Sequence, residues 1–122
     1  MGRPDVAITV ADLGARTTVV SVDGDLDLDA ADEFRAALTP RHGEGGRLIV
    51  DLAGTTFIDS VGLGAIAAAA KRAARADGDV TVVASDPRVV RVFEITGFDH
   101  WVRVVRSLDE AIIRGRPPTA AA

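Results

Sequence analysis

The chain has 122 residues, the length of one domain, and its formal net charge of −4 argues against a typical nucleic-acid-binding protein. Cysteine is absent, which excludes disulfides, thiolate metal sites and a thiol nucleophile. With four Phe, one Trp and no Tyr, the chain has few aromatic side chains on which nucleic-acid bases could stack.

The first half of the chain predicts a hairpin, a helix and a buried strand. Residues 6–10 and 17–22 are expected to form strands, because β-branched residues are frequent there and turn residues lie between them. Asp29 is the expected N-cap of a helix over residues 30–38, which a proline and a glycine-rich loop end. The apolar run over residues 47–52 predicts a strand that is buried on both faces.

The second half predicts three more helices and two more strands. The longest helix is expected over about residues 61–76, and the strands over residues 80–84 and 101–105. Another helix begins at residues 85–87, with proline in its first turn, and the last helix is capped by Ser107. The side chains expected to face inward are Leu63, Ile66, Ala67, Ala70 and Ala74 in the longest helix, and Leu108, Ala111 and Ile112 in the last.

The element order ββαβαβαβα predicts an α/β protein with a mixed β-sheet of about five strands flanked by about four helices. We expect one domain over residues 6–114, an N-terminal tail over residues 1–5 and a disordered C-terminal tail over residues 115–122. The N-terminus has no apolar signal region, and the apolar stretch at residues 61–70 is too short to cross a bilayer. These features predict a cytoplasmic protein that does not insert into membranes.

Ser60 is the candidate functional residue, because it follows a buried strand and opens the alanine-rich helix. Free backbone N–H groups and the positive end of the helix dipole tolerate a negative group at such a place. Three roles are open for this serine: a helix cap, a catalytic nucleophile and a phosphate acceptor. A phosphate would add about −1.5 to −2 charges, which a helix N-terminus tolerates and a protein interface does not.

Catalytic and metal-binding functions find little support in the sequence. A nucleophile elbow needs glycine two residues on each side of the serine, but residue 58 is Ile, and only His42 and His100 could serve as a base. The acidic turn at residues 23–29 differs from a calcium-binding loop, since its glycine comes second and its twelfth position is Phe34. We therefore expect no enzyme activity, no cofactor and no metal site.

Three motifs, in order, resemble the STAS domain family and, within it, the bacterial anti-sigma factor antagonists. The segment Asp59-Ser60-Val61-Gly62-Leu63-Gly64 matches the family's Asp-Ser-Ser/Thr-Gly-Leu-Gly stretch except at Val61. The segment Gly24-Asp25-Leu26-Asp27 resembles its Gly-Glu-Leu-Asp, and residues 89–98 resemble its helix that ends in a Gly-Leu/Phe turn. The resemblance covers residues 6–113, almost the whole chain.

This resemblance implies a function in transcription regulation by partner switching. The unphosphorylated protein would bind an anti-sigma factor that is also an ATP-dependent serine kinase, which frees the sigma factor. Phosphorylation would then separate the complex, and a serine phosphatase would reset it. Ser60 would be the phosphate acceptor, Asp59 would help to position it, and Asp27 would lie near it. The residues implied to bind the partner are Asp27, Asp59, Ser60, Val61, Gly62 and Leu63.

A second interpretation stays open, in which the chain is a STAS module of a stress-signalling scaffold or a cytoplasmic subunit of a membrane transporter. Stable co-purification with a scaffold or a transporter would favour it. The basic cluster Lys71, Arg72 and Arg75 lies in the last turns of the longest predicted helix. Cations suit the helix dipole there, so we interpret the cluster as a solvated helix end without a nucleic-acid partner.

Overall fold

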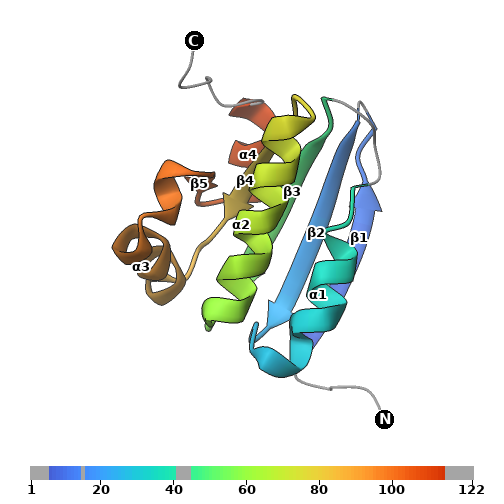
Figure 1. Ribbon diagram of the computed structural model, residues 1–122. Helices are drawn as coiled ribbons and strands as arrows, with labels where there is room; N and C mark the ends of the chain where they lie inside the picture. The colour runs from blue at the N-terminus through green and yellow to red at the C-terminus, as the bar shows by residue number, and fades with distance from the viewer. Residues whose placement is uncertain (1–5, 15, 41–44, 115–122) are drawn as a thin grey trace.

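The computed structural model describes residues 6–14, 16–40 and 45–114, and within them five strands form one sheet in the order β1-β2-β3-β4-β5 (Figure 1). The strands are β1 (Val6–Asp12), β2 (Thr17–Gly24), β3 (Arg47–Gly54), β4 (Asp79–Val83) and β5 (Arg103–Val105). β1 pairs antiparallel with β2, whereas β2 to β5 run parallel. The predicted mixed α/β sheet is confirmed. The tails predicted at residues 1–5 and 115–122 lie outside the described residues, and the domain boundaries stay a prediction.

The helices cover both faces of the sheet. They are α1 (Ala31–Ala37), α2 (Ser60–Arg75), α3 (Pro87–Thr96) and α4 (Leu108–Arg114), with short 3₁₀ turns η1 (Leu28–Ala30) and η2 (Phe98–His100). α1 and α2 lie side by side on one face, α3 lies beyond the β5 edge, and α4 lies behind the sheet (Figure 1). Connections between parallel strands are right-handed, which places the helices of successive crossovers on the same side of the sheet. Among the residues described, no helix has the length and apolar character needed to cross a membrane.

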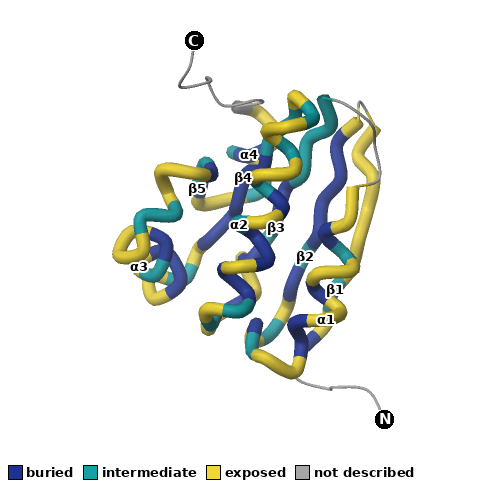
Figure 2. The backbone as a smooth tube through the Cα atoms, viewed as in Figure 1, coloured by how far each residue is buried: buried dark blue, intermediate teal, exposed yellow. Residues whose placement is uncertain are grey.

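Two apolar cores lie on the two faces of the sheet. The larger core joins the sheet to α1, α2 and α3, each of which has buried stretches (Figure 2). Its fully buried side chains include Phe34, Ile66 and Phe93. The smaller core lies under α4, where Ala111 packs against Ile49 and inward residues of the other parallel strands. β3 contributes to both cores, since Val50 and Leu52 belong to the larger and Ile49 to the smaller. The prediction of a strand buried on both faces is therefore confirmed.

The predicted cap of the first helix was wrong. The carboxylate of Asp27 accepts hydrogen bonds from the backbone N–H groups of Asp29, at 3.1 Å, and of Ala30, at 3.3 Å. The chain consequently turns through η1 before α1 begins at Ala31, and Ala30 gives α1 no side-chain cap. Both aspartates satisfy the sequence preference for a cap, so the preference alone does not choose between them.

The inward faces of two helices also differ from the prediction. α2 buries Ala65 and Ala69, whereas Ala74, predicted to face inward, is exposed. Alanine occupies so much of α2 that several stripes satisfy the helical period, and the structure uses the one that starts at Gly62. In α4, Ala111 is buried but Ile112 is 45% exposed, because this short helix packs on the sheet through a single narrow stripe.

Candidate functional site

The connection from β3 to α2 separates the capping residue from the exposed serine. Asp59 is the N-cap of α2, and its Oδ1 accepts hydrogen bonds from the backbone N–H groups of Val61 and Gly62, both at 3.0 Å. Ser60 is the first residue of the helix and is exposed. Of the three roles that the sequence left open for Ser60, the cap therefore belongs to Asp59. The serine hydroxyl is left at the surface, where it can meet another molecule.

A short backbone pairing holds a second loop beside Ser60. Leu26, after β2, and Ile58, after β3, form an isolated parallel bridge. The N–H of Leu26 donates to the carbonyl of Phe57 at 2.9 Å, and the N–H of Asp59 donates to the carbonyl of Leu26 at 3.1 Å. Asp27 and Asp59 each follow a bridged residue, and each caps the helical turn after it. The bridge thus brings the two predicted acidic residues together at the carboxyl ends of neighbouring parallel strands.

The remaining predicted partner-binding residues lie at different depths. Val61 is half-buried, as are both capping aspartates, whereas Gly62 is buried and Leu63 is only 7% exposed. A Cβ on Gly62 would lie 3.0 Å from Cγ1 of Ile58, so a larger residue would crowd the buried Ile58 where the first turn of α2 packs on the bridge. Gly62 and Leu63 therefore lie beneath the exposed surface, and their role in binding a partner stays a prediction.

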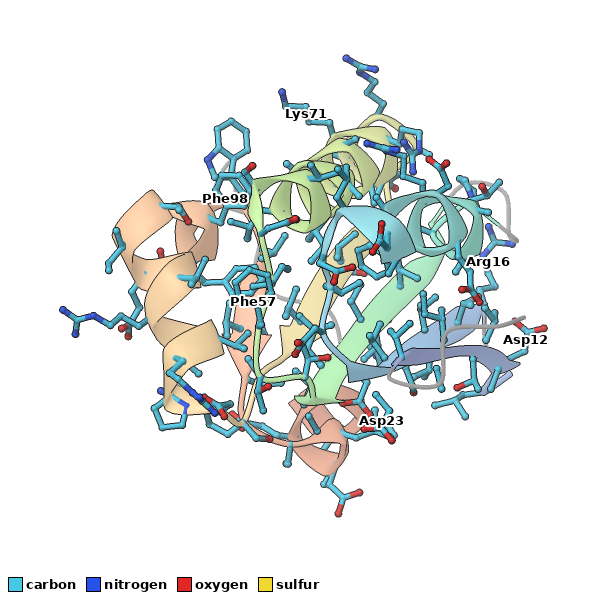
Figure 3. The ribbon with its side chains drawn as sticks, turned by 90° about the horizontal axis from the view of Figure 1, so that it is seen from below. Asp12, Arg16, Asp23, Phe57, Lys71 and Phe98 are labelled. Atoms are coloured by element: carbon cyan, nitrogen blue, oxygen red, sulfur yellow. The ribbon has the colours of Figure 1, made fainter. Side chains whose placement is uncertain are left out.

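The surface around Ser60 is acidic, with two exposed apolar side chains. Besides Asp27 and Asp59, the loop after β2 carries the exposed residues Asp25 and Asp29, whereas Asp23, near the end of β2, lies on the α4 side of the sheet (Figure 3). Leu28 and Phe57, one from each bridged loop, are 69% and 49% exposed, and Phe57 lies on the side of its loop that faces α3 (Figure 3). The sequence analysis missed both apolar residues, although Leu28 stands between two aspartates in a turn. Such a surface suits a protein partner, since exposed apolar groups beside charges are typical of binding sites.

The structure places one of the two histidines and shows no metal-binding group among the described residues. His100 lies in η2, and its Nε2 is 3.9 Å from Oδ1 of Asp99, while His42 lies outside the described residues. Among the described side chains, no three His, Asp or Glu residues are grouped so that they could hold a metal ion.

A family model described as STAS domain matches residues 9–111, so the chain belongs to the STAS domain family. The resemblance that the three motifs indicated is thereby confirmed. The anti-sigma-B factor antagonist of Staphylococcus aureus (strain NCTC 8325 / PS 47) is 33% identical over 86 residues, which cover 70% of this chain and 80% of that protein.

Solved structures agree with this assignment. A crystal structure of an anti-sigma factor antagonist from Mycobacterium paratuberculosis superposes with a TM-score of 0.78 at 29% identity, covering 96% of this chain and 100% of that one. The phosphorylated form of SpoIIAA, a Bacillus cell fate determinant, gives a TM-score of 0.69 at 22% identity over 90% of this chain and 100% of that one. This last similarity shows a shared fold.

Proposed function

We propose that this protein is an anti-sigma factor antagonist that acts in the cytoplasm as a binding protein and not as an enzyme. In its unphosphorylated form it binds an anti-sigma factor that is also a serine kinase, and phosphorylation of Ser60 separates the two. A serine phosphatase restores the binding form. The relatives named as anti-sigma factor antagonists support this proposal. The observation that carries it is the exposed Ser60 at the start of α2, with Asp59 taking over the capping of the helix.

The surroundings of Ser60 explain how a phosphate could end binding without unfolding the protein. Asp59 already accepts hydrogen bonds from two of the free N–H groups of α2, so a phosphate gains little from the helix N-terminus. It also adds charge to a surface that carries Asp27 and other carboxylates. A partner shaped to fit the neutral hydroxyl would then face an additional charge of about −1.5 to −2, which must be desolvated on binding.

The test is a reconstitution with purified proteins. Each anti-sigma factor serine kinase encoded in the source genome is mixed with this protein, first without and then with ATP, and complex formation is followed by size-exclusion chromatography. Peptide mapping by mass spectrometry locates the phosphate. We expect a complex that ATP dissociates, with the phosphate on Ser60.

Two variants sharpen this test. Ser60→Ala should bind the kinase and stay bound when ATP is added. Thr56→Ala is the matched control, because Thr56 is an exposed hydroxyl residue in the same loop whose Oγ1 donates to Asp25 at 3.3 Å. This control should be phosphorylated and released like the unmodified protein. ATP-dependent release of Ser60→Ala, or a phosphate mapped elsewhere, would contradict the proposal.

A further inference from the structure

A groove of about 490 Å³ lies between α1 and α2 and begins beside Ser60. α1 and α2 lie next to each other on the same face of the sheet (Figure 1), and residues of both helices line the groove. The apolar part of its wall is formed by Val61, Gly64, Ala65 and Ala68 of α2 and by Leu38 and Pro40 after α1. The groove therefore extends the surface around Ser60 along α2 towards the other end of the helix.

Gly64 has no role inside the protein that would explain it. Glycine in the interior of a helix is less favourable than alanine, because it gains no side-chain packing and loses more backbone entropy. A Cβ on Gly64 would meet no atom within 4 Å, whereas a Cβ on Gly62 would lie 3.0 Å from Ile58. Gly62 thus has an internal reason to be glycine and Gly64 does not. What Gly64 does provide is bare backbone at the wall of the groove, which another molecule can approach closely.

Two arginines give the groove a positive charge. Arg35 lies in the last turn of α1 and Arg72 in the last turn of α2, and both line the groove. Arg35 is 3.2 Å from Asp32, but both side chains are largely exposed, so water screens this pair and other guanidinium N–H groups can still donate. From the sequence, we interpreted the basic cluster of Lys71, Arg72 and Arg75 as a solvated helix end. In the structure, Nζ of Lys71 lies 6.0 Å from the centroid of the Trp101 ring, whereas Arg72 lines the groove.

We propose that this groove binds an amphipathic helix of the anti-sigma factor partner. Its apolar side would face the stretch from Val61 to Ala68, and an acidic residue would face Arg35 and Arg72. α2 rises about 16 Å from Val61 to Arg72, which matches about three turns of a partner helix. Small residues let two helices pack at a short interaxial distance, which accounts for the glycine and alanines in the wall. This inference rests on the proposed function, since it names the segment that the kinase places beside Ser60.

The same arrangement explains how a phosphate on Ser60 would weaken binding in the groove. Ser60 is next to Val61, the wall residue at the near end of the groove. A phosphate on Ser60 would therefore lie against the same partner helix whose acidic residue faces the arginines. A phosphate there would have to be desolvated against the apolar side of this helix, so one modification at the end of the groove weakens the contact along it.

The groove is tested by binding measurements with the kinase that forms a complex with the unmodified protein. Gly64→Leu projects a side chain into the groove from a position with open space, and Arg72→Glu reverses the charge at its far end. We expect each to raise the dissociation constant at least about tenfold, with the thermal midpoint of Gly64→Leu unchanged or higher. Arg75→Glu is the matched control: it makes the same charge change one turn further along α2, outside the groove, and should bind within about threefold of the unmodified protein.

Crosslinking identifies the occupant directly. The chain has no cysteine, so Ala68→Cys, at an exposed position in the wall, provides a single attachment point for a thiol-linked photo-crosslinker. We expect the crosslink to reach an acidic, helical segment of the kinase. A crosslink to a basic or non-helical segment would overturn the inference.

The outcomes separate this inference from the proposed function. If Ser60→Glu weakens binding while Gly64→Leu and Arg72→Glu bind like the unmodified protein, the groove is not used and the switch at Ser60 stands. If the unmodified protein binds none of the kinases, both proposals fail. If sedimentation shows a dimer that Gly64→Leu dissociates, the occupant is a second copy of this chain, which overturns the partner helix.

Discussion

At the scale of single residues, the neighbouring Asp59 and Ser60 have separate tasks, and mutations can address them separately. Ser60→Asp and Ser60→Glu place a carboxylate at the first position of α2, where the helix dipole changes stability by only about 0.3–1 kcal/mol in its favour. We expect weaker kinase binding, measured by calorimetry, and a nearly unchanged thermal midpoint. Tight binding by both variants would count against an electrostatic switch.

Asp59 should behave in the opposite way. Asp59→Ala removes the acceptor of two backbone N–H groups and should lower the free energy of unfolding by about 1 kcal/mol. Asp59→Asn keeps a capping oxygen and should retain most of that stability. Urea unfolding of the two variants measures the difference. Equal losses in both would mean that the charge of Asp59, and not its capping geometry, stabilises α2.

At the scale of the helix, the two glycines of α2 are a matched pair. Gly64→Ala should raise the free energy of unfolding by roughly 0.5–1 kcal/mol, because alanine favours the helix and its Cβ meets open space. Gly62→Ala should gain nothing or lose stability, since Ile58 is buried and held in the bridge that the new Cβ would crowd. Denaturant unfolding of both variants tests this. Equal gains at the two sites would show that the first turn of α2 can move away from the bridge.

The N-terminus of α3 provides a pH-dependent contact. Arg88 holds the carboxylate of Asp86 with its side chain, at 3.0 and 2.7 Å, and with its backbone N–H at 2.8 Å, which lowers the pKa of Asp86 from 3.8 to about 2. Since the folded pKa is the lower one, the stability that this ionised cap contributes is present above pH 3.8 and is lost as the pH falls through 2.

A carboxyl-detected NMR titration checks this directly. In the unmodified protein, Asp86 should titrate near pH 2, and in Arg88→Ala its pKa should return towards the ordinary value, because the largest cause of the shift is the Arg88 side chain. Arg91→Ala, at an exposed position on the same helix, is the control and should leave the Asp86 pKa low. An unchanged Asp86 pKa in Arg88→Ala would assign the shift to the helix N-terminus instead.

The strands and helices that could be predicted are those with a signal in the local sequence. β-branched runs and turn residues identify the strands, and the Pro87 and Gly97 boundaries of α3 follow from residues with strong backbone preferences. The Asp59–Gly64 motif identified Ser60. The bridge between Leu26 and Ile58 has no local signal, because it pairs residues far apart in sequence. The groove could not be predicted for the same reason, since its wall combines α1 and α2.

At the scale of the whole molecule, charge and function are distributed unevenly. The acidic loops with Asp27 and Asp59 lie at the carboxyl ends of β2 and β3, beside the start of α2. Arg35 and Arg72 line the groove, and Arg72 lies in the last turn of α2. The net charge of −4 therefore conceals a basic region on an acidic protein. Electrostatic complementarity along such a surface fixes the orientation of a partner more than it adds affinity.

A mutation on the α4 side of the sheet should lower the stability of the protein without weakening kinase binding. Ser60 and the groove belong to the side of the larger core, whereas α4 covers the smaller core on the other side. Ala111→Asp places a charge in that smaller core, where Ala111 is 1% exposed, and should lower the free energy of unfolding by about 2–4 kcal/mol. The loss stays in this range because the seven-residue α4 can move away from the sheet and hydrate the charge.

Kinase binding by the same variant completes the prediction. At 25 °C, while the sheet and α2 stay folded, Ala111→Asp should bind the kinase with a dissociation constant within about threefold of the unmodified protein. Hydrogen exchange should show faster exchange in α4 and unchanged protection in α2. Ile112→Asp, one residue further on and 45% exposed, is the control and should change neither stability nor binding. Weaker binding by Ala111→Asp under these conditions would mean that α4 supports the surface around Ser60 through the sheet, so the two faces would be coupled.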